Sequence, residues 1–109
     1  MPIAVHPSGR AAGAEITGCN LATDLDDANF AVIQDALDEH GVIYLRNQTL
    51  TPDQQVAFTE RFGEPDVNFN ALRFGVDGSP TIYRISNITE NGLAIGTRRA
   101  GETWHTDMS

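Results

Sequence analysis

The sequence predicts a mixed fold in which α-helices flank short β-strands, and three observations carry this prediction. Two segments, at about 27 to 40 and 52 to 62, place apolar residues at helical spacing behind recognisable helix starts. Short apolar segments between turn residues are typical of strands. Two long loops, 64 to 80 and 87 to 101, lead toward residues 104 to 107, and long loops in a small domain are often functional. A chain of 109 residues has room for one such domain.

The first half of the chain is predicted to begin with two strands and a helix. Residues 3 to 6 and 14 to 17 are expected to be extended on either side of a glycine-containing turn. Asp26 or Asp27 can cap a helix that ends near His40. The apolar residues of this helix recur at helical spacing and are expected to face a core: Phe30, Ile33, Ala36 and Leu37.

The middle of the chain is predicted to form a strand and a second helix. Gly41 occupies the position at which many helices end in a left-handed residue. Residues 42 to 45 follow as a strand of the buried type, and residues 46 to 48 turn the chain. Three residues are typical of a capped helix start: Thr51, Pro52 and Gln54. This helix is expected to add Phe58 and Phe62 to the core and to stop at Gly63.

The last part of the chain carries a candidate metal site. Residues 81 to 85 and 104 to 108 are predicted strands, and Trp104 is expected to pack in the core. Alternate residues of a strand face the same side, so His105 and Asp107 would point together. An imidazole nitrogen and a carboxylate oxygen can then bind one metal ion. A second histidine would complete the facial triad of non-haem Fe(II) oxygenases.

The tripeptide alone is a weak signal. Three histidines and an acidic fraction of 15 in 109 give about 0.4 chance matches to a histidine followed two residues later by an acid. The alternative is a structural pair, in which the imidazole and the carboxylate belong to a hydrogen-bond network. On the tripeptide by itself, that alternative is favoured. His6 and His40 are expected to lie at the surface and at a helix end, where a cation is favourable.

Composition limits the classes of partner. Fifteen acidic and seven basic residues give a formal charge of -8, which disfavours nucleic acid as a partner. We see no apolar run of about 20 residues and no secretory signal, so no membrane partner is expected. Cys19 is the single cysteine, which indicates a reducing cytoplasm and a small buried side chain.

Several segments together resemble the taurine dioxygenase-like (TauD/TfdA) family of Fe(II)/2-oxoglutarate-dependent dioxygenases. Their order and spacing match that family from near residue 14 onward. The segments are AEITG at 14 to 18, NL at 20 to 21, EHGVIYLRNQ at 39 to 48, LTPDQQ at 50 to 55, RFGE at 61 to 64, ISN at 85 to 87 and WHTD at 104 to 107. Colinear segments of this kind are far more specific than one tripeptide.

The resemblance implies a fold and a reaction. The fold is a double-stranded β-helix (jelly roll, cupin-like) with flanking helices, incomplete here because residues 1–109 would be the N-terminal part of a single dioxygenase domain. His105 and Asp107 would be the catalytic iron ligands. With Fe(II), the cosubstrate 2-oxoglutarate and O2, such an enzyme hydroxylates a small organic acid and releases succinate and CO2. The third ligand and the arginine that holds 2-oxoglutarate are expected beyond Ser109.

The resemblance also bears on the substrate. The run from Pro65 to Asn70 lacks the histidine that taurine dioxygenase carries there, and the residues before Trp104 differ as well, which disfavours taurine. The loop that starts at Ile85 looks more like the aryloxyalkanoate dioxygenases, which indicates an anionic, carboxylate-bearing substrate. Asn68 could line the substrate pocket, although a turn role is equally compatible. Arg98 and Arg99 could steer an anion but are expected to be solvated.

Two other classes stay open at this point. One is a non-catalytic relative that keeps the fold for binding or assembly. The other is an iron- or zinc-dependent enzyme of the wider cupin type. An incomplete barrel would expose strand edges, so residues 1–109 alone are expected to self-associate, with a homo-oligomer as one form, and to lack activity.

Overall fold

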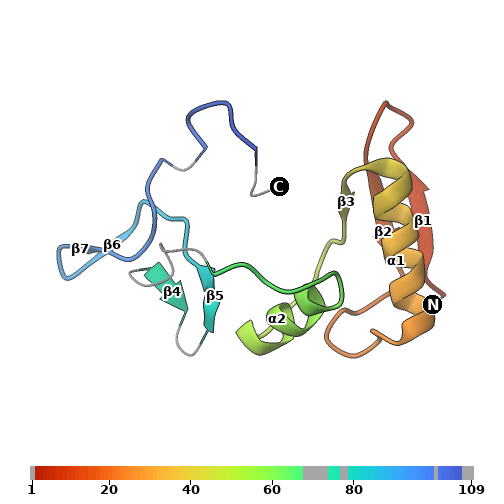
Figure 1. Ribbon diagram of the computed structural model, residues 1–109, viewed down its shortest axis with the longest axis horizontal. Helices are drawn as coiled ribbons and strands as arrows, with labels where there is room; N and C mark the ends of the chain where they lie inside the picture. The colour runs from red at the N-terminus through yellow and green to blue at the C-terminus, as the bar shows by residue number, and fades with distance from the viewer. Residues whose placement is uncertain (1, 68–73, 77–78, 100, 107–109) are drawn as a thin grey trace. The chain divides into compact units, whose positions relative to one another are not determined.

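The computed structural model describes residues 2–67, 74–76, 79–99 and 101–106. The chain forms two compact units, Met1–Glu64 and Pro65–Ser109, and each is treated by itself below. Figure 1 shows the helices in the first unit and short strands in both. The helices of the described part are too short or too polar to cross a membrane.

The first unit is built on a three-stranded sheet. Strands β1 (Ala4–Pro7) and β2 (Ala14–Thr17) pair antiparallel, and β3 (Ile43–Tyr44) pairs parallel with β2. A parallel pair needs a crossover connection, which here contains helix α1 (Asp27–His40). The strand predicted at 14 to 17 is confirmed, and the one predicted at 3 to 6 is found one residue later, at 4 to 7.

The buried strand predicted at 42 to 45 is wrong in its length and its burial. Only Ile43 and Tyr44 are paired, while Val42 is 60% and Tyr44 is 42% exposed. The physical reason is that β3 is an edge strand, since it stands at one end of the strand order β1-β2-β3. Tyr44 also pairs with Glu15, which alternates with the buried Ala14 and Ile16 along β2 and so lies on the opposite face.

Helix α1 has the capped ends that the sequence predicts. The Asn29 N–H donates to Asp26 Oδ1 at 2.7 Å, so Asp26 is the N-cap. Gly41 ends the helix with φ 77°, and its N–H donates to the Leu37 carbonyl at 2.9 Å. A non-glycine residue would be strained in this conformation.

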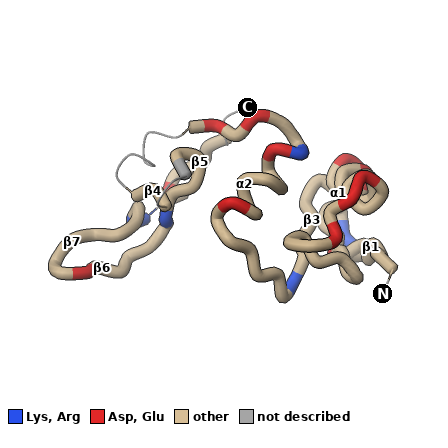
Figure 2. The backbone as a smooth tube through the Cα atoms, turned by 90° about the horizontal axis from the view of Figure 1, so that it is seen from below, with Lys and Arg blue, Asp and Glu red and all other residues tan. Residues whose placement is uncertain are grey.

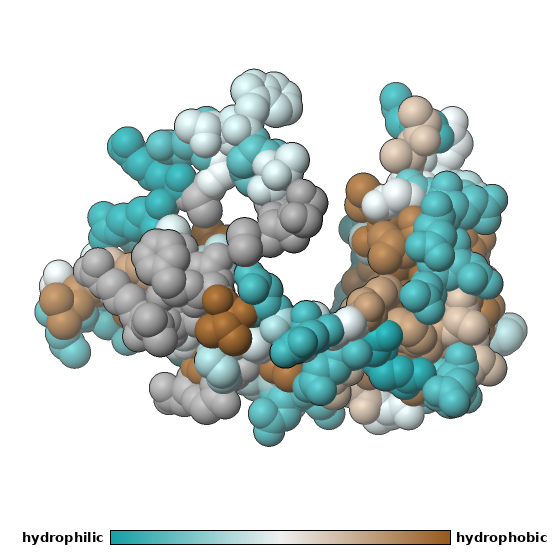
Figure 3. All heavy atoms as spheres, in the orientation of Figure 1, coloured by the Kyte–Doolittle hydropathy of each residue, from teal (hydrophilic) through white to brown (hydrophobic). Residues whose placement is uncertain are grey.

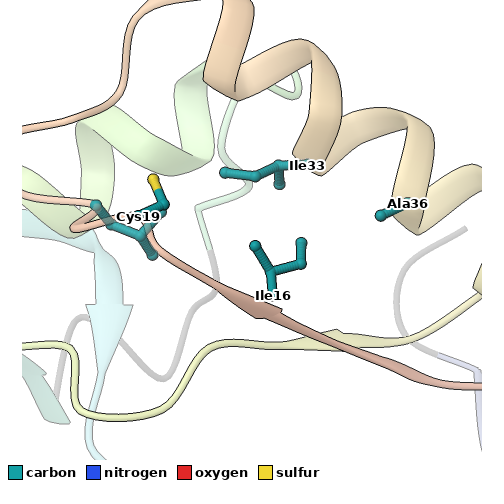
Figure 4. Close-up of a cluster of buried hydrophobic side chains, with 5 residues drawn as sticks. Ile16, Cys19, Ile33 and Ala36 are labelled. Carbon is teal, nitrogen blue, oxygen red and sulfur yellow. The ribbon is translucent and has the colours of Figure 1, made fainter. Parts of the chain in front are cut away.

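The core of the first unit lies between α1 and β2. Figure 4 shows Ile33 and Ala36 from the helix facing Ile16 from the strand, with Cys19 beside them. Ile33 is fully buried and Ile16 is 2% exposed. The prediction that Cys19 is a small buried residue is confirmed, since it is 7% exposed. Leu37, predicted as core, is only partly buried.

The loop after β2 is held by Gln48, 29 residues further along the chain. The Gln48 amide donates to the Cys19 carbonyl at 3.0 Å and accepts from the Leu21 N–H at 2.9 Å. Gly18 opens this loop with φ 79°, and a Cβ there would run into the carbonyl oxygen of Pro2. Position 18 therefore needs glycine for two independent reasons.

Helix α2 (Pro52–Glu60) shows the predicted capping box. The Gln54 N–H donates to Thr51 Oγ1 at 3.2 Å, and the Thr51 N–H donates to Gln54 Oε1 at 2.9 Å. The helix ends at Glu60, earlier than predicted, and none of its residues is buried.

The aromatic residues of this region still pack, although less deeply than expected. The Phe62 ring meets Phe30 edge-on at 4.9 Å and Phe58 at 5.2 Å between centroids, yet Phe62 stays 38% exposed. Arg61 lies over the Phe30 ring at 4.6 Å and donates to Asp27 at 2.8 Å. These contacts join α2 to the start of α1.

The second unit contains two short antiparallel ladders. Strand β4 (Gly75–Val76) pairs with β5 (Ser79–Tyr83), and β6 (Thr89–Glu90) pairs with β7 (Leu93–Ala94). The strand predicted at 81 to 85 therefore starts and ends earlier, with Ile85 in an isolated parallel bridge to Thr97.

Both predicted loops contain strands that were not predicted from the sequence. Strand β4 lies inside 64 to 80, and the β6–β7 hairpin lies inside 87 to 101. The hairpin had a signal, since Asn91 and Gly92 have φ 52° and 76° and Asn-Gly favours a two-residue hairpin turn. Within the described residues the strands form three small sheets and no closed barrel.

The surface carries charged, polar and apolar residues side by side. Figure 2 shows acidic residues along α1, whose first turn carries Asp27. Figure 3 shows apolar side chains among hydrophilic ones on the visible face of the first unit. Among the described residues, Val42 is one of the large apolar side chains that are exposed.

Candidate metal centre

The segment that carries the candidate metal ligand does not form the predicted strand in its described part. Residues 104 to 106 pair with no strand among the described residues, and a strand needs such a partner. Trp104 is fully exposed, so its predicted place in the core is wrong. Asp107 and Asn68 lie outside the described residues, so their predicted roles stay predictions.

His105 is held by the carbonyl group two residues before it. Its Nδ1 lies 2.6 Å from the Thr103 carbonyl oxygen. A carbonyl oxygen only accepts, so this contact requires a proton on Nδ1. Histidines that bind metals commonly donate their other ring N–H to such an acceptor. The contact of His105 with Thr103 is therefore compatible with a histidine that binds a divalent metal ion.

A hollow of about 550 Å³ lies beside this histidine. The described residues that line it are 101 to 105, which include Glu102, Trp104 and His105. Its volume exceeds that of a metal ion alone. His105 itself is an exposed residue.

The backbone before His105 is fixed at one end by close packing. The Thr97 N–H donates to the Arg84 carbonyl at 2.8 Å, and the Ser86 N–H donates to the Thr97 carbonyl at 3.1 Å. Gly96 is buried there, and a Cβ on it would come within 2.8 Å of the Ser86 nitrogen. A side chain at residue 96 would push these two segments apart.

Two left-handed residues follow this anchor. Arg99 has φ 53° and Gly101 has φ 78°. Arg99 Nε lies 3.8 Å from Glu102 Oε1, and both side chains are largely exposed. Arg98 is exposed as predicted, whereas Arg99 is paired as well as exposed. An exposed pair of this kind contributes about 0 to 1 kcal/mol.

The other histidines are placed as the sequence predicts. His6 lies at the surface, with Nε2 2.8 Å from Thr17 Oγ1. His40 closes α1, with Nε2 3.7 Å from Glu39. Across the described parts of the chain, no group of three His, Cys, Asp or Glu side chains could hold a metal ion.

The first unit has a smaller hollow that the sequence did not indicate. Its volume is about 220 Å³, and residues 15 to 19 and 46 to 48 line it. Arg46 borders it but pairs with Glu15 at 3.2 Å and stacks 5.2 Å above the Tyr44 ring. The arginine charge is therefore already balanced by the protein.

Comparison with known proteins identifies curated relatives over nearly the whole chain. Over 106 residues it is 38% identical to an alpha-ketoglutarate-dependent sulfate ester dioxygenase of Pseudomonas putida, covering 96% of this chain and 32% of that protein. It is 34% identical over 106 residues to an (S)-phenoxypropionate/alpha-ketoglutarate-dioxygenase of Sphingobium herbicidovorans, covering 96% and 35%. The chain thus spans about a third of the length of these relatives.

Solved structures similar to this chain include a taurine dioxygenase and AAD-2. A taurine dioxygenase from Burkholderia xenovorans matches with a TM-score of 0.67 and 40% identity, over 74% of this chain and 29% of that one. AAD-2, solved in complex with Mn(II) and N-oxalylglycine, matches with a TM-score of 0.57 and 26% identity, over 61% and 24%.

The family match covers both compact units. The family described as "Taurine catabolism dioxygenase TauD, TfdA family" matches residues 4–109, which include the segment of His105. Since that match takes in nearly all of the chain, the protein belongs to the TauD/TfdA family of dioxygenases.

Proposed function

We propose that residues 1–109 form the N-terminal part of a single Fe(II)- and 2-oxoglutarate-dependent dioxygenase domain with a double-stranded β-helix fold. The family match and the structural similarity to a taurine dioxygenase support this proposal. The full-length protein would hydroxylate a small organic acid. The reaction balances as substrate C–H, O2 and 2-oxoglutarate giving substrate C–OH, succinate and CO2.

We propose His105 and Asp107 as two iron ligands. The observation that supports this is the contact between His105 Nδ1 and the Thr103 carbonyl, with which Nε2 would be the metal-binding nitrogen. Asp107 would add a carboxylate oxygen, and imidazole with carboxylate suits non-haem Fe(II). A further histidine and a 2-oxoglutarate-binding arginine would come from outside the 109 residues.

The protein groups position reactants, and the metal supplies the oxidative chemistry. Fe(II), when bound, lets O2 oxidise 2-oxoglutarate and the substrate in one cycle. The part of this chain is to hold the iron through His105 and Asp107 and to border the space beside it. The Thr103 carbonyl would favour the tautomer with the proton on Nδ1.

The substrate is proposed to be a small anion. A sulfate ester dioxygenase and a phenoxypropionate dioxygenase are among the relatives, and both names denote anionic compounds. Arg98 is an exposed cation in the segment before His105. Asn68 is proposed as a further substrate contact. Taurine, an alkyl sulfate and 2-phenoxypropionate form the panel that tests this proposal.

The experiment uses the anaerobic full-length protein with Fe(II). Addition of 2-oxoglutarate should produce a visible metal-to-ligand charge-transfer band, and O2 should then give succinate. His105→Ala should abolish both signals, whereas the control His6→Ala removes another exposed histidine and should keep both. A 2-oxoglutarate-dependent band that survives His105→Ala would contradict the ligand assignment. Absence of any band in the wild type would favour a non-catalytic relative or a different metal enzyme.

A further inference from the structure

The three-stranded sheet of the first unit has one covered face and one open face. Ile43 and Leu45 pack against the core cluster to which α1 and β2 contribute. Val42 and Tyr44 alternate with them along the chain, so their side chains lie on the opposite face of the sheet. There Val42 is 60% and Tyr44 is 42% exposed. Two large apolar side chains on the open face are thus only partly covered.

The polar side chains of this open face are paired with one another. Glu15, which stands opposite Tyr44, lies 3.2 Å from Arg46 Nε, and the Arg46 guanidinium lies 5.2 Å from the Tyr44 ring centroid. His6, opposite Glu15 on β1, has Nε2 2.8 Å from Thr17 Oγ1. Burial of a polar group is costly mainly when the group lacks a partner. This face can therefore be covered while these polar groups keep the partners they have.

Strand β3 also presents a free backbone edge within the described residues. The Ala14 N–H donates to the Val42 carbonyl at 3.0 Å, so the backbone groups of Val42 turn toward β2. Alternate residues of a strand turn their backbone groups to opposite sides, so the N–H and C=O of Ile43 turn away from β2. No described strand lies on that side, since β3 ends the strand order (Figure 1). An edge of this kind readily pairs with another strand.

The sequence around β3 is of the kind found in strands that are covered on both faces. Residues 42 to 45 are four consecutive apolar residues, Val-Ile-Tyr-Leu, and β3 runs parallel to β2. Strands of parallel sheets are usually buried on both faces and carry such continuous runs, whereas alternation marks a sheet with one solvated face. The first unit supplies a layer on one face, and the run predicts a second layer on the other.

We propose that a strand from the part of the protein outside residues 1–109 pairs with the free edge of β3, and that its layer covers Val42 and Tyr44. This inference rests on the single domain of the proposed function. Residues 1–109 span 32% and 35% of two curated relatives, so a protein of that length has most of its residues outside this chain. A second copy of the chain and residues 65–109 are the other occupants, and the test separates them.

The first test identifies what lies over Tyr44 in the full-length protein. The photo-cross-linker p-benzoylphenylalanine replaces Tyr44, with the same replacement of Gln34, an exposed residue of α1, as the control. After irradiation, mass spectrometry of the monomer and dimer bands should show that position 44 links to residues outside 1–109, whereas position 34 gives few links. Links only to residues 65–109, links only to a second copy, or no links at all would overturn the proposal.

The second test uses the wild-type full-length protein and hydrogen exchange at single residues. The Ile43 N–H should be protected about a hundredfold or more relative to an unstructured peptide, because it would be paired in a sheet. The Tyr44 N–H, which turns toward β2, is the internal control and should be protected in either case. Protection of Tyr44 without protection of Ile43 would contradict the proposed strand.

The two tests also separate this inference from the proposed function. A full-length protein that protects Ile43 but gives no 2-oxoglutarate-dependent band keeps the docking face and loses the dioxygenase assignment. A full-length protein that forms succinate while Ile43 exchanges freely keeps the activity and overturns the docking face.

Discussion

The side-chain amide of Gln48 donates to the carbonyl of Cys19 at 3.0 Å, although the two residues are 29 positions apart. The same side chain accepts from the Leu21 N–H at 2.9 Å. One amide thus satisfies both a donor and an acceptor of the loop after β2. A carboxylate of the same shape can accept but cannot donate.

Gln48→Glu should therefore destabilise the protein. It leaves the Cys19 carbonyl without its donor and brings a carboxylate toward it, for which we expect a loss of about 1 to 3 kcal/mol. Urea unfolding of the full-length protein measures the change. Gln55→Glu adds the same charge at an exposed position of α2 and should change stability by less than about 0.5 kcal/mol. Equal effects at both positions would show that charge, rather than the lost donor, is responsible.

Ile33 should be the most sensitive position of the first core. It is fully buried between α1 and β2, so Ile33→Ala leaves a cavity and should lower the free energy of unfolding by about 2 to 5 kcal/mol. Ile33→Val removes one methylene and should cost about 0.5 to 1.5 kcal/mol. Gln34→Ala, at an exposed site of α1, serves as the control and should change little. A small effect of Ile33→Ala would contradict the described core.

Cys19 should react slowly in the folded protein. Burial raises the pKa of the Cys19 thiol, and the nearby Asp24 and Asp26 raise it further. Less thiolate is therefore present at pH 8 than in a free cysteine, whose pKa is about 8.5. Iodoacetamide labelling followed by mass spectrometry should be much slower in the native than in the urea-unfolded protein. Equal rates would mean that the thiol is accessible.

The raised pKa of the Cys19 thiol also makes the stability of the protein depend on pH. Because the folded pKa is raised, the folded state disfavours the thiolate, so stability falls as pH rises through about 8.5, where the unfolded thiol ionises. Cys19→Ser, which does not ionise there, should lack this part of the pH dependence. The difference between the two unfolding free energies, measured from pH 7 to 10, isolates the effect. A difference that stays constant over this range would contradict the raised pKa.

Thr97 should tolerate loss of its hydroxyl. Its Oγ1 is buried and has no hydrogen-bond partner among the described residues. Thr97→Val keeps the shape and removes an unsatisfied polar atom, so stability should stay equal or rise by about 1 kcal/mol. Thr89→Val, on the exposed strand β6, is the control and should be within about 0.5 kcal/mol of the wild type. Destabilisation by Thr97→Val would reveal a partner of that hydroxyl.

Residues 1–109 alone should not catalyse the reaction. Among the described residues no three candidate ligands come together, and we propose that the arginine for 2-oxoglutarate comes from outside residues 1–109. Incubation with Fe(II), 2-oxoglutarate and O2 should give no succinate above a protein-free control. The full-length protein, prepared in the same way, is the positive control. Iron-dependent succinate from the 109 residues would contradict the proposed division of the site.

Features set by neighbouring residues could be predicted from the sequence. The Asp26 cap, the Gly41 end and the box of Thr51 and Gln54 all act within one helical turn. Buried positions on α1 follow from spacing for the same reason, as Ile33 shows. The hairpin at Asn91 and Gly92 was equally local and was missed because the surrounding loop composition masked it.

Features that depend on distant partners could not be predicted. The burial of residues 42 to 45 depends on whether further strands and layers cover β3, which the local sequence does not state. Trp104 is large and apolar, yet its burial requires a surface to pack on. The contact of His105 with Thr103 needed coordinates as well, since any residue supplies a carbonyl. His105 itself was predicted as a ligand because colinear segments supported a weak motif, and that role stays a prediction.

The close approach at Gly18 also limits how the chain can vary. Its positive φ and the Pro2 carbonyl in the place of a Cβ act together, so a change of backbone angle cannot make room for a side chain. A saturation library read out by folding should return a single amino acid at position 18, while the exposed Asn20 nearby accepts a wider set. The start of the chain is thereby tied to the loop after β2, and shortening it past Pro2 would leave the positive φ as the remaining reason for glycine.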